Sequence, residues 1–225
     1  MPAFNVGFVI FPELTQLDFT GPLQILARMP GAAVHIVAKS LAPVPSDCGL
    51  GLVPTHTFES CPQLDLICVP GGSAGVIGAI GDAGTIDFVR RQAAGAQYVT
   101  SVCTGAFILG AAGLLQGRRA TTHWAYTELL PLVGATHEQA RVVKDGNLIT
   151  AGGVTSGIDF GLSVAAEIAG EDAARAIQLL MEYDPSPPFD FVPFERAPVA
   201  VKSALSARMD KARAALAGQL ERALV

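Results

Sequence analysis

The 225-residue sequence carries little charge and no concentration of positive charge. Asp, Glu, Lys and Arg make up 16% of the residues, and the 20 acidic side chains outnumber the 15 basic ones. The formal net charge of −5, with no cluster of Lys and Arg, argues against a surface that follows the phosphates of a nucleic acid. Half of the residues are hydrophobic, which is typical of a compact globular chain. We therefore expect no nucleic-acid partner.

Long apolar runs and a basic leader are also missing. No apolar run approaches the roughly 20 residues that a helix needs to span a bilayer. The opening residues, MPAFNVGF, lack the basic region of a secretory signal. The four cysteines show no metal-ligand spacing, and a chain that is not exported has little use for disulfides. These absences predict a cytoplasmic protein with reduced thiols, no metal site and no membrane partner.

The most informative segment surrounds Cys103. The apolar run 98–102 has β-strand character and leads directly into this cysteine, and a helical pattern begins at Ala106. A strand that turns sharply into a helix places the turn residue where unpaired N–H groups and the helix dipole favour an anion. The pattern predicts a nucleophilic thiol with a depressed pKa. The alternative is a small buried hydrophobe, but Gly105 and the abrupt change of period favour the elbow.

Strand and helix patterns alternate along the chain. Four nearly continuous apolar runs have the length of buried strands, at 6–11, 34–38, 64–69 and 98–102. Helical patterns lie among them at 21–29, 85–96 and 106–115. The alternation predicts an α/β fold with a mostly parallel sheet covered on both faces. In 142–150, Asp-Gly between two short β runs predicts an antiparallel hairpin, after which Thr155 or Ser156 caps another helix.

The C-terminal part is expected to be an appendage. After Tyr183, prolines preclude helix and regular strand, so the segment 184–194 should lie extended over the surface. An amphipathic helical pattern fills 199–224, too short to form a helix-turn-helix module. We therefore divide the chain into an α/β domain, residues 1–195, and a C-terminal helix, residues 196–225. This helix packs either on the domain or at a dimer interface.

Several candidate site residues should meet at the carboxyl ends of the strands, where open parallel sheets bind ligands. Asp18 follows the first strand between two apolar residues, and desolvation there would raise its pKa toward a range suited to proton transfer. The alternative for Asp18 is a helix cap. Gly71 and Gly72 follow the third strand, either as a simple turn or as a loop whose N–H groups approach negative charge. His123 is a possible general base or a structural histidine before a helix.

Four motifs together carry a family resemblance: FPELTQLDFTGP, DLICVPGG, TSVCTGA and ATTHW. They resemble the ThiJ/PfpI superfamily over residues 4 to 190, with its class I glutamine amidotransferase-like fold. The resemblance implies a flavodoxin-like three-layer sandwich, a homodimer and a cysteine nucleophile that needs no cofactor. The protease-like branch has His directly after the cysteine, where this chain has Thr104, and the deglycase branch has Glu in place of Asp18. Related regulators of the AraC type add a helix-turn-helix domain that this chain is too short to hold.

Within the superfamily, the motifs are most similar to those of isocyanide hydratases. That resemblance implies that Asp18 works with Cys103 and that Thr104 orients Asp18 or a water molecule. The expected substrate is a small isocyanide, hydrated to an N-substituted formamide through a thioimidate on Cys103. Asp18 would be the general acid and base, and the Gly72 N–H with the elbow amides would hold negative charge. The alternatives are a redox or small-molecule sensing module, and a cysteine hydrolase for amides or aldehydes.

Overall fold

A seven-stranded, mostly parallel sheet forms the centre of the fold. The computed structural model describes residues 3–190 and 193–224. The sheet has the strand order β10-β11-β7-β6-β1-β2-β5, and only the β10–β11 pair is antiparallel. Its strands are β1 (Phe4–Val9), β2 (Ala32–Ala38), β5 (His56–Thr57), β6 (Leu66–Val69), β7 (Tyr98–Val102), β10 (Val142–Asp145) and β11 (Leu148–Ala151). The predicted α/β class and parallel sheet are confirmed.

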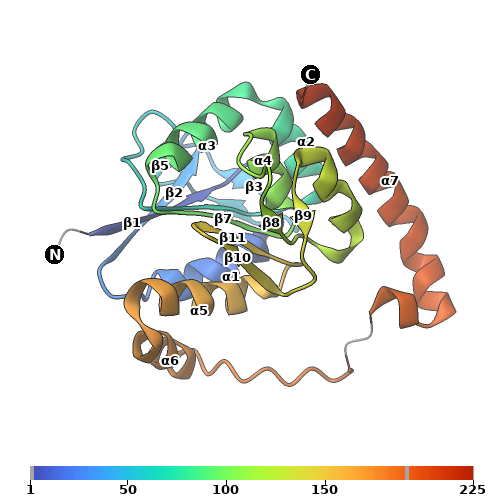
Figure 1. Cartoon of the computed structure of the whole chain (residues 1–225). Helices are drawn as coiled ribbons and strands as arrows, with labels where there is room; N and C mark the ends of the chain where they lie inside the picture. The colour runs from blue at the N-terminus through green and yellow to red at the C-terminus, as the bar shows by residue number, and fades with distance from the viewer. Residues whose placement is uncertain (1–2, 191–192, 225) are drawn as a thin grey trace.

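Helices cover both faces of this sheet (Figure 1). On one face α1 (Gln16–Leu26) packs against α5 (Ser156–Ala169), with α6 (Glu171–Leu180) outside α5. The other face carries α2 (Ser73–Gly81), α3 (Ala83–Gly95) and α4 (Ala106–Ala111). Two short pairs, β3 (Val44–Pro45) with β4 (Gly51–Leu52) and β8 (Arg119–Ala120) with β9 (Thr136–His137), lie outside the sheet. The 3-10 segments are η1 (Cys103–Gly105), η2 (Trp124–Val133) and η3 (Phe194–Arg196).

Helix α1 begins five residues earlier than the sequence predicts, at Gln16 rather than at residue 21. Gly21 and Pro22 suggested a helix start, but both lie inside the helix. Proline removes the hydrogen bond to the carbonyl four residues earlier, yet its fixed φ suits a helix, so the helix continues through it. The consequence is functional, because Asp18 lies in the first turn of α1 instead of in a loop.

The glycine-rich helix α2 was not predicted, and α4 ends at Ala111 instead of continuing to residue 115. Glycine lowers helix propensity, which hid α2 in the sequence. Gly75 nevertheless has a packing reason: a Cβ there would lie 2.6 Å from the carbonyl oxygens of Pro12 and Glu13. Close approach of α2 to the loop after β1 therefore requires glycine. This approach brings the β1 and β6 ends of the sheet together around one site.

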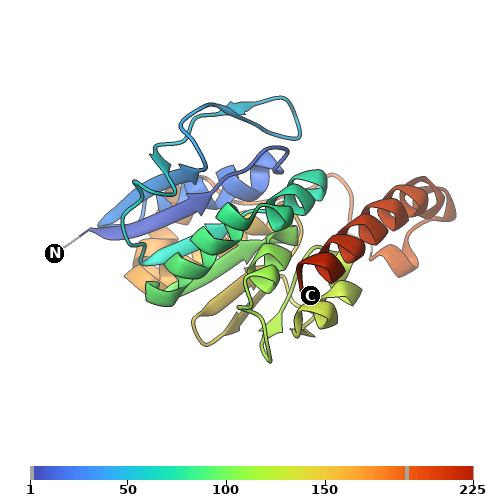
Figure 2. The same cartoon turned by 90° about the horizontal axis from the view of Figure 1, so that it is seen from above.

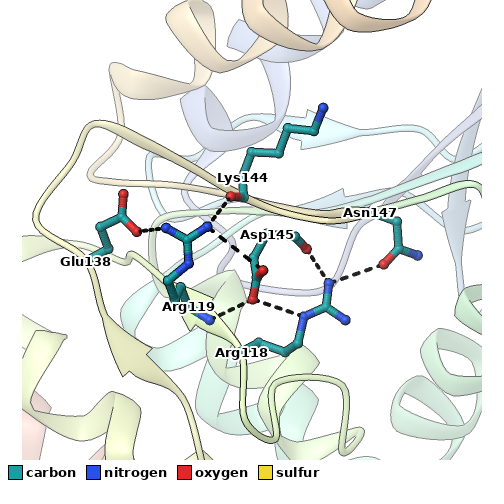
Figure 3. A network of polar contacts seen from close by, with 6 residues as sticks. All are labelled: Arg118, Arg119, Glu138, Lys144, Asp145 and Asn147. Atoms are coloured by element: carbon teal, nitrogen blue, oxygen red, sulfur yellow. Dashed lines mark hydrogen bonds and ion pairs between the residues drawn. The ribbon is translucent and has the colours of Figure 1, made fainter.

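The predicted hairpin is confirmed as β10 and β11, and a charged network fastens its turn (Figure 3). Asp145 accepts hydrogen bonds from Arg118 Nε at 3.2 Å and from the Arg119 backbone N–H at 2.9 Å. Arg118 also reaches Asn147, and Arg119 forms an ion pair with Glu138. The network ties the hairpin to the β8–β9 pair on the surface of the molecule.

The C-terminal helix α7 (Val199–Ala223) lies along one end of the sandwich, against α2 and η2 (Figure 2). Leu216 and Leu220 anchor it in the core. The chain before it is irregular from Tyr183 through residue 190, as predicted; Phe191 and Val192 of that predicted segment lie outside the described residues. The division between residues 195 and 196 falls inside η3 and stays a prediction. Among the described helices, none combines the length and apolar character needed to cross a membrane.

Candidate active site

Cys103 occupies a strained elbow between β7 and the helical segments that follow it. Its φ is +57°, a left-handed conformation that non-glycine residues rarely adopt and that is characteristic of functional turns. The Cys103 N–H donates to the Gly152 carbonyl at 2.9 Å, and the Thr122 hydroxyl donates to the Cys103 carbonyl at 2.8 Å. Both peptide groups of the elbow are thus hydrogen-bonded, which holds the strained turn in place. The predicted elbow is present.

Asp18 reaches this elbow from the first turn of α1. Its side chain is fully buried, and the Gly71 N–H donates to Oδ2 at 3.0 Å. The thiol of Cys103 interacts with the carboxyl, but within the described chain Oδ1 has no hydrogen-bond partner of regular geometry. Asp18 makes no capping bond to its own helix, so the helix-cap alternative is not what the structure shows. One carboxyl oxygen is fixed, and the other remains available for a proton beside the thiol.

Burial dominates the acid–base properties of the pair. It raises the pKa of Asp18 to about 7, although the Cys103 thiol and the Gly71 N–H act in the opposite direction, and the nearby Asp47 carboxylate adds to the rise. Burial, followed by the Asp18 charge, also raises the pKa of the Cys103 thiol well above its usual value. At neutral pH the pair therefore holds its proton on sulfur when Asp18 is ionised.

The depressed thiol pKa expected from the sequence is therefore wrong for this structure. The backbone N–H groups of Thr104 and Val154 do lower the pKa of Cys103, as donors at an elbow should. They are outweighed because the sulfur is buried and faces a carboxyl group rather than a cation. The elbow also opens into a three-residue 3-10 turn and a six-residue helix, a short source of dipole. In this arrangement the Asp18 carboxyl, not a cation, is the charged group beside the thiol.

Gly71 makes this pairing sterically feasible. A Cβ at residue 71 would lie 2.7 Å from Asp18 Oδ2, 2.7 Å from the Thr104 nitrogen and 2.8 Å from Cys103 Cβ. Any side chain there would push the carboxyl and the thiol apart. The sequence pointed to Gly71 as a donor near negative charge, and its N–H does face a carboxyl, that of Asp18.

Thr104 and Gly72 are hydrogen-bonded to each other, which the sequence did not predict. The Gly72 N–H donates to Thr104 Oγ1 at 3.0 Å, so it is engaged by the threonine rather than offered to an incoming charge. The Thr104 hydroxyl in turn lies 3.4 Å from the Gly72 carbonyl, which it can donate to. The structure therefore shows Thr104 bonded to the glycine loop and not to Asp18. Both residues still line the cavity above the cysteine.

A cavity of about 100 Å³ opens at Cys103. It is lined by residues that follow four strands (β1, β6, β7 and β11) and by residues at η2 and on α7: Thr15, Gly72, Ser73, Cys103, Thr104, His123, Tyr126, Val154 and Met209. Sequence reasoning did not identify five of these as site residues. Thr15 lies inside a motif that could have indicated it, and Val154 follows the predicted hairpin. Met209 lies more than 100 residues after the elbow, and no local signal connects it to the site.

His123 lines the cavity but serves as a cap. Its Nδ1 accepts the Ala125 N–H at 3.2 Å at the start of η2, and its ring lies 5.8 Å from that of Tyr126. Burial lowers the pKa of His123, which keeps the imidazole neutral. The structural alternative of the sequence analysis therefore describes His123 better than the general-base alternative.

A strained cysteine at the end of a parallel strand, beside a buried carboxyl from the first helix, defines an α/β-sandwich protein with a nucleophile-elbow cysteine. Comparison with known proteins makes the assignment specific. The model of the DJ-1/PfpI family matches residues 5–167, and the chain belongs to this family. The resemblance carried by the four sequence motifs is thereby confirmed.

Individual relatives extend over more of the chain. The "Isonitrile hydratase" of Pseudomonas putida is 58% identical over 199 residues, which span 88% of this chain and 87% of the relative. The crystal structure of a ThiJ/PfpI family protein from Pseudomonas syringae matches with a TM-score of 0.90 and 45% identity, covering 97% of this chain and 92% of that one. The "HTH-type transcriptional regulator CdhR" of Pseudomonas aeruginosa is 28% identical over 74% of this chain but only 51% of the regulator.

Proposed function

We propose that this protein is an isocyanide hydratase, which converts R–N≡C and water into the formamide R–NH–CHO. The observation that carries the proposal is the buried Asp18–Cys103 pair, whose cysteine lines a small cavity. The similarity to the Pseudomonas putida isonitrile hydratase supports it, isonitrile being another word for isocyanide. The chemistry needs one nucleophile and one group that both accepts and donates a proton near neutral pH. Cys103 and Asp18 provide these two functions.

In the first half-reaction, ionised Asp18 accepts the thiol proton while the sulfur attacks the terminal carbon of the isocyanide. One C–S bond forms, the S–H bond breaks, and the carbon gains electron density as its triple bond to nitrogen becomes a double bond. Asp18 then donates the same proton to that carbon. The product is the thioimidate R–N=CH–S on Cys103, with no net gain or loss of protons. A carboxyl pKa of about 7 suits both transfers.

In the second half-reaction, ionised Asp18 removes a proton from water, whose oxygen attacks the thioimidate carbon. The proton passes to nitrogen, giving R–NH–CH(OH)–S on Cys103. The C–S bond then breaks, the hydroxyl proton returns to sulfur through Asp18, and R–NH–CHO leaves. The N–H groups of Thr104 and Val154, which bond to the sulfur, stabilise it as a leaving thiolate.

The direct test is formamide production from an alkyl isocyanide, followed by absorbance or NMR. Wild-type protein should give many turnovers per chain, and Cys103→Ala should give none above background while keeping its fold. Cys68→Ala is the matched control, because Cys68 is a fully buried cysteine of β6 with a pKa raised to about 12 by burial. Its turnover should stay within a few-fold of wild type. A fully active Cys103→Ala variant would end the proposal.

A sensing module is the second candidate, favoured by the match to half of a transcriptional regulator. Against an oxidation sensor stands the burial of Cys103 and its raised pKa, since oxidation requires an accessible thiolate. Stoichiometry separates the candidates: an enzyme consumes many equivalents of isocyanide, whereas a sensor binds or reacts once.

We also propose that the working form is a homodimer in the cytoplasm. Leu50 and Val53, beside the β3–β4 pair, expose large apolar side chains, as does Val199 of α7, and a partner subunit would cover such surface. Sedimentation at micromolar concentration should give twice the chain mass of 23.3 kDa. A stable monomer would contradict the dimer without touching the proposed chemistry.

A further inference from the structure

Helix α7 contributes one side chain to the reaction cavity, Met209. The family model matches residues 5–167, so α7 lies outside the part of the chain that this model covers. The cysteine, the carboxyl and the glycine loop all lie within that part. Met209 therefore forms a wall of the cavity that lies outside the family model. Such a wall is well suited to distinguish substrates, because its residue can change without disturbing the catalytic groups.

Of the side chains around the cavity, Met209 is the adjustable one. Thr15 bonds to Asp47 at 2.8 Å, Ser73 lies 3.3 Å from the Tyr126 hydroxyl, and His123 accepts the Ala125 N–H. Val154 is β-branched and therefore stiff. Methionine is unbranched and flexible, and it fills irregular apolar space. Because the isocyanide carbon must lie at the Cys103 sulfur, the substituent R occupies the remaining cavity and meets this wall.

Arg213 holds the Met209 segment of α7 against η2. It lies four residues after Met209, on the same side of α7. Its guanidinium donates to the Ala125 carbonyl at 3.3 Å and forms a 2.9 Å ion pair with Glu128, both in η2, the segment that also supplies Tyr126. Further along α7, Leu216 and Leu220 are buried. Met209 is therefore held at a set distance from the aromatic side of the cavity.

We propose that Met209 on α7 determines the size of the substituent that the site accepts, an inference that rests on the proposed isocyanide hydration. The site as built takes compact alkyl substituents and disfavours extended aryl ones. Arg213 is a positioning residue that acts through Met209.

The test compares kcat/KM for isopropyl and 2-naphthyl isocyanide in wild type, Met209→Ala and Met209→Trp. The naphthyl-to-isopropyl ratio should rise roughly tenfold in Met209→Ala and fall in Met209→Trp, the scale expected for a few methylene groups of pocket space. Leu205→Ala is the matched control: Leu205 is half-buried one turn earlier on α7 and does not line the cavity. Its ratio should equal that of wild type. Arg213→Ala should raise the ratio less than Met209→Ala does.

A second readout does not depend on hydration. Cys103 is alkylated with iodoacetamide and with its N-phenyl derivative, and mass spectrometry gives the two rates. The N-phenyl-to-parent rate ratio should also rise in Met209→Ala and stay unchanged in Leu205→Ala. If this ratio shifts but no isocyanide is hydrated, the role of Met209 as a size limit is supported and the proposed function fails. If isocyanides are hydrated but neither ratio changes when Met209 is replaced, the proposed function is supported and the role of Met209 as a size limit is rejected.

Discussion

Two aspartates of this molecule lie in opposite environments. Asp18 is fully buried, next to a thiol and a backbone N–H, and burial raises its pKa to about 7. Asp145 lies at the surface hairpin, where the Arg119 backbone N–H and the Arg118 guanidinium lower its pKa (Figure 3). The first carboxyl can exchange a proton near neutral pH; the second is a permanent charge. The same residue type therefore has a raised pKa at one place and a lowered pKa at the other, and the proposed mechanism assigns the chemistry to the aspartate with the raised pKa.

The largest effect should come from removing the exchangeable proton. Asp18→Asn preserves an acceptor for the Gly71 N–H but cannot accept and then donate a proton, so kcat should fall by roughly 10²–10⁴. Asp145→Asn removes the other carboxyl and should leave kcat and KM unchanged, because Asp145 does not line the cavity and bonds to Arg119 at the hairpin turn. Steady-state kinetics on one alkyl isocyanide measures both. An equal loss of kcat in the two variants would contradict the different roles assigned to Asp18 and Asp145.

A second change separates the carboxyl from the thiol without altering either. The added Cβ of Gly71→Ala would lie 2.7 Å from Asp18 Oδ2 and 2.8 Å from Cys103 Cβ, so the two groups must move apart. Displacement of about an ångström at a reacting centre costs on the order of 10² in rate. Gly78→Ala in α2 is the control, since its Cβ meets nothing within 4 Å. Wild-type kcat in a folded Gly71→Ala protein would show that the close approach is unnecessary.

The pH dependence of kcat/KM should report the same carboxyl. Asp18 must be ionised to accept the thiol proton, and its pKa is about 7. Activity should therefore fall about tenfold per pH unit well below 7 and level off above it. The profile of Asp145→Asn should superimpose on that of wild type. A profile that is flat between about pH 5 and 8 would contradict the assigned role of Asp18.

The smallest effects concern stability. The contributions of the two aspartates to the free energy of unfolding should depend on pH in opposite directions. The pKa of Asp18 is higher in the native state than in the unfolded chain, where it has the ordinary aspartate value of about 4. The native state therefore holds this proton more tightly, and the free energy of unfolding falls as pH rises from about 4 to 7. The Tm of Asp18→Asn relative to wild type should accordingly increase across that interval. Asp145 has the opposite effect, because its pKa is lower in the native state than in the unfolded chain. Its ionised carboxyl stabilises the fold above the unfolded-state pKa, and this stabilisation is lost as the pH falls. Asp145→Asn should lower Tm at pH 7 and do so less at pH 3. Thermal melts at three pH values test both signs.

The parts of the site that depend on local sequence were predictable. The apolar run before Cys103 and the helical pattern after it gave the elbow, and topology then brought Asp18 and Gly71 to the same edge. The thiol pKa was not predictable, because it depends on burial and on a carboxyl 85 residues away in sequence. Helix α2 was hidden by its glycines, of which Gly75 is explained by a close packing contact that the sequence does not reveal. For Met209, the amphipathic pattern of α7 indicated a packed face but not what that face contacts.

The central claim is that Asp18 carries the exchangeable proton of the site. Its ionisation can be measured directly by carbon NMR of protein labelled with ¹³C at the aspartate side-chain carboxyl, with Asp18→Asn identifying the resonance by its disappearance. We expect the Asp18 signal to titrate near pH 7, and the Asp145 signal, assigned with Asp145→Asn, to titrate below the usual aspartate range. An Asp18 signal that titrates near 4, like an exposed aspartate, would contradict the account.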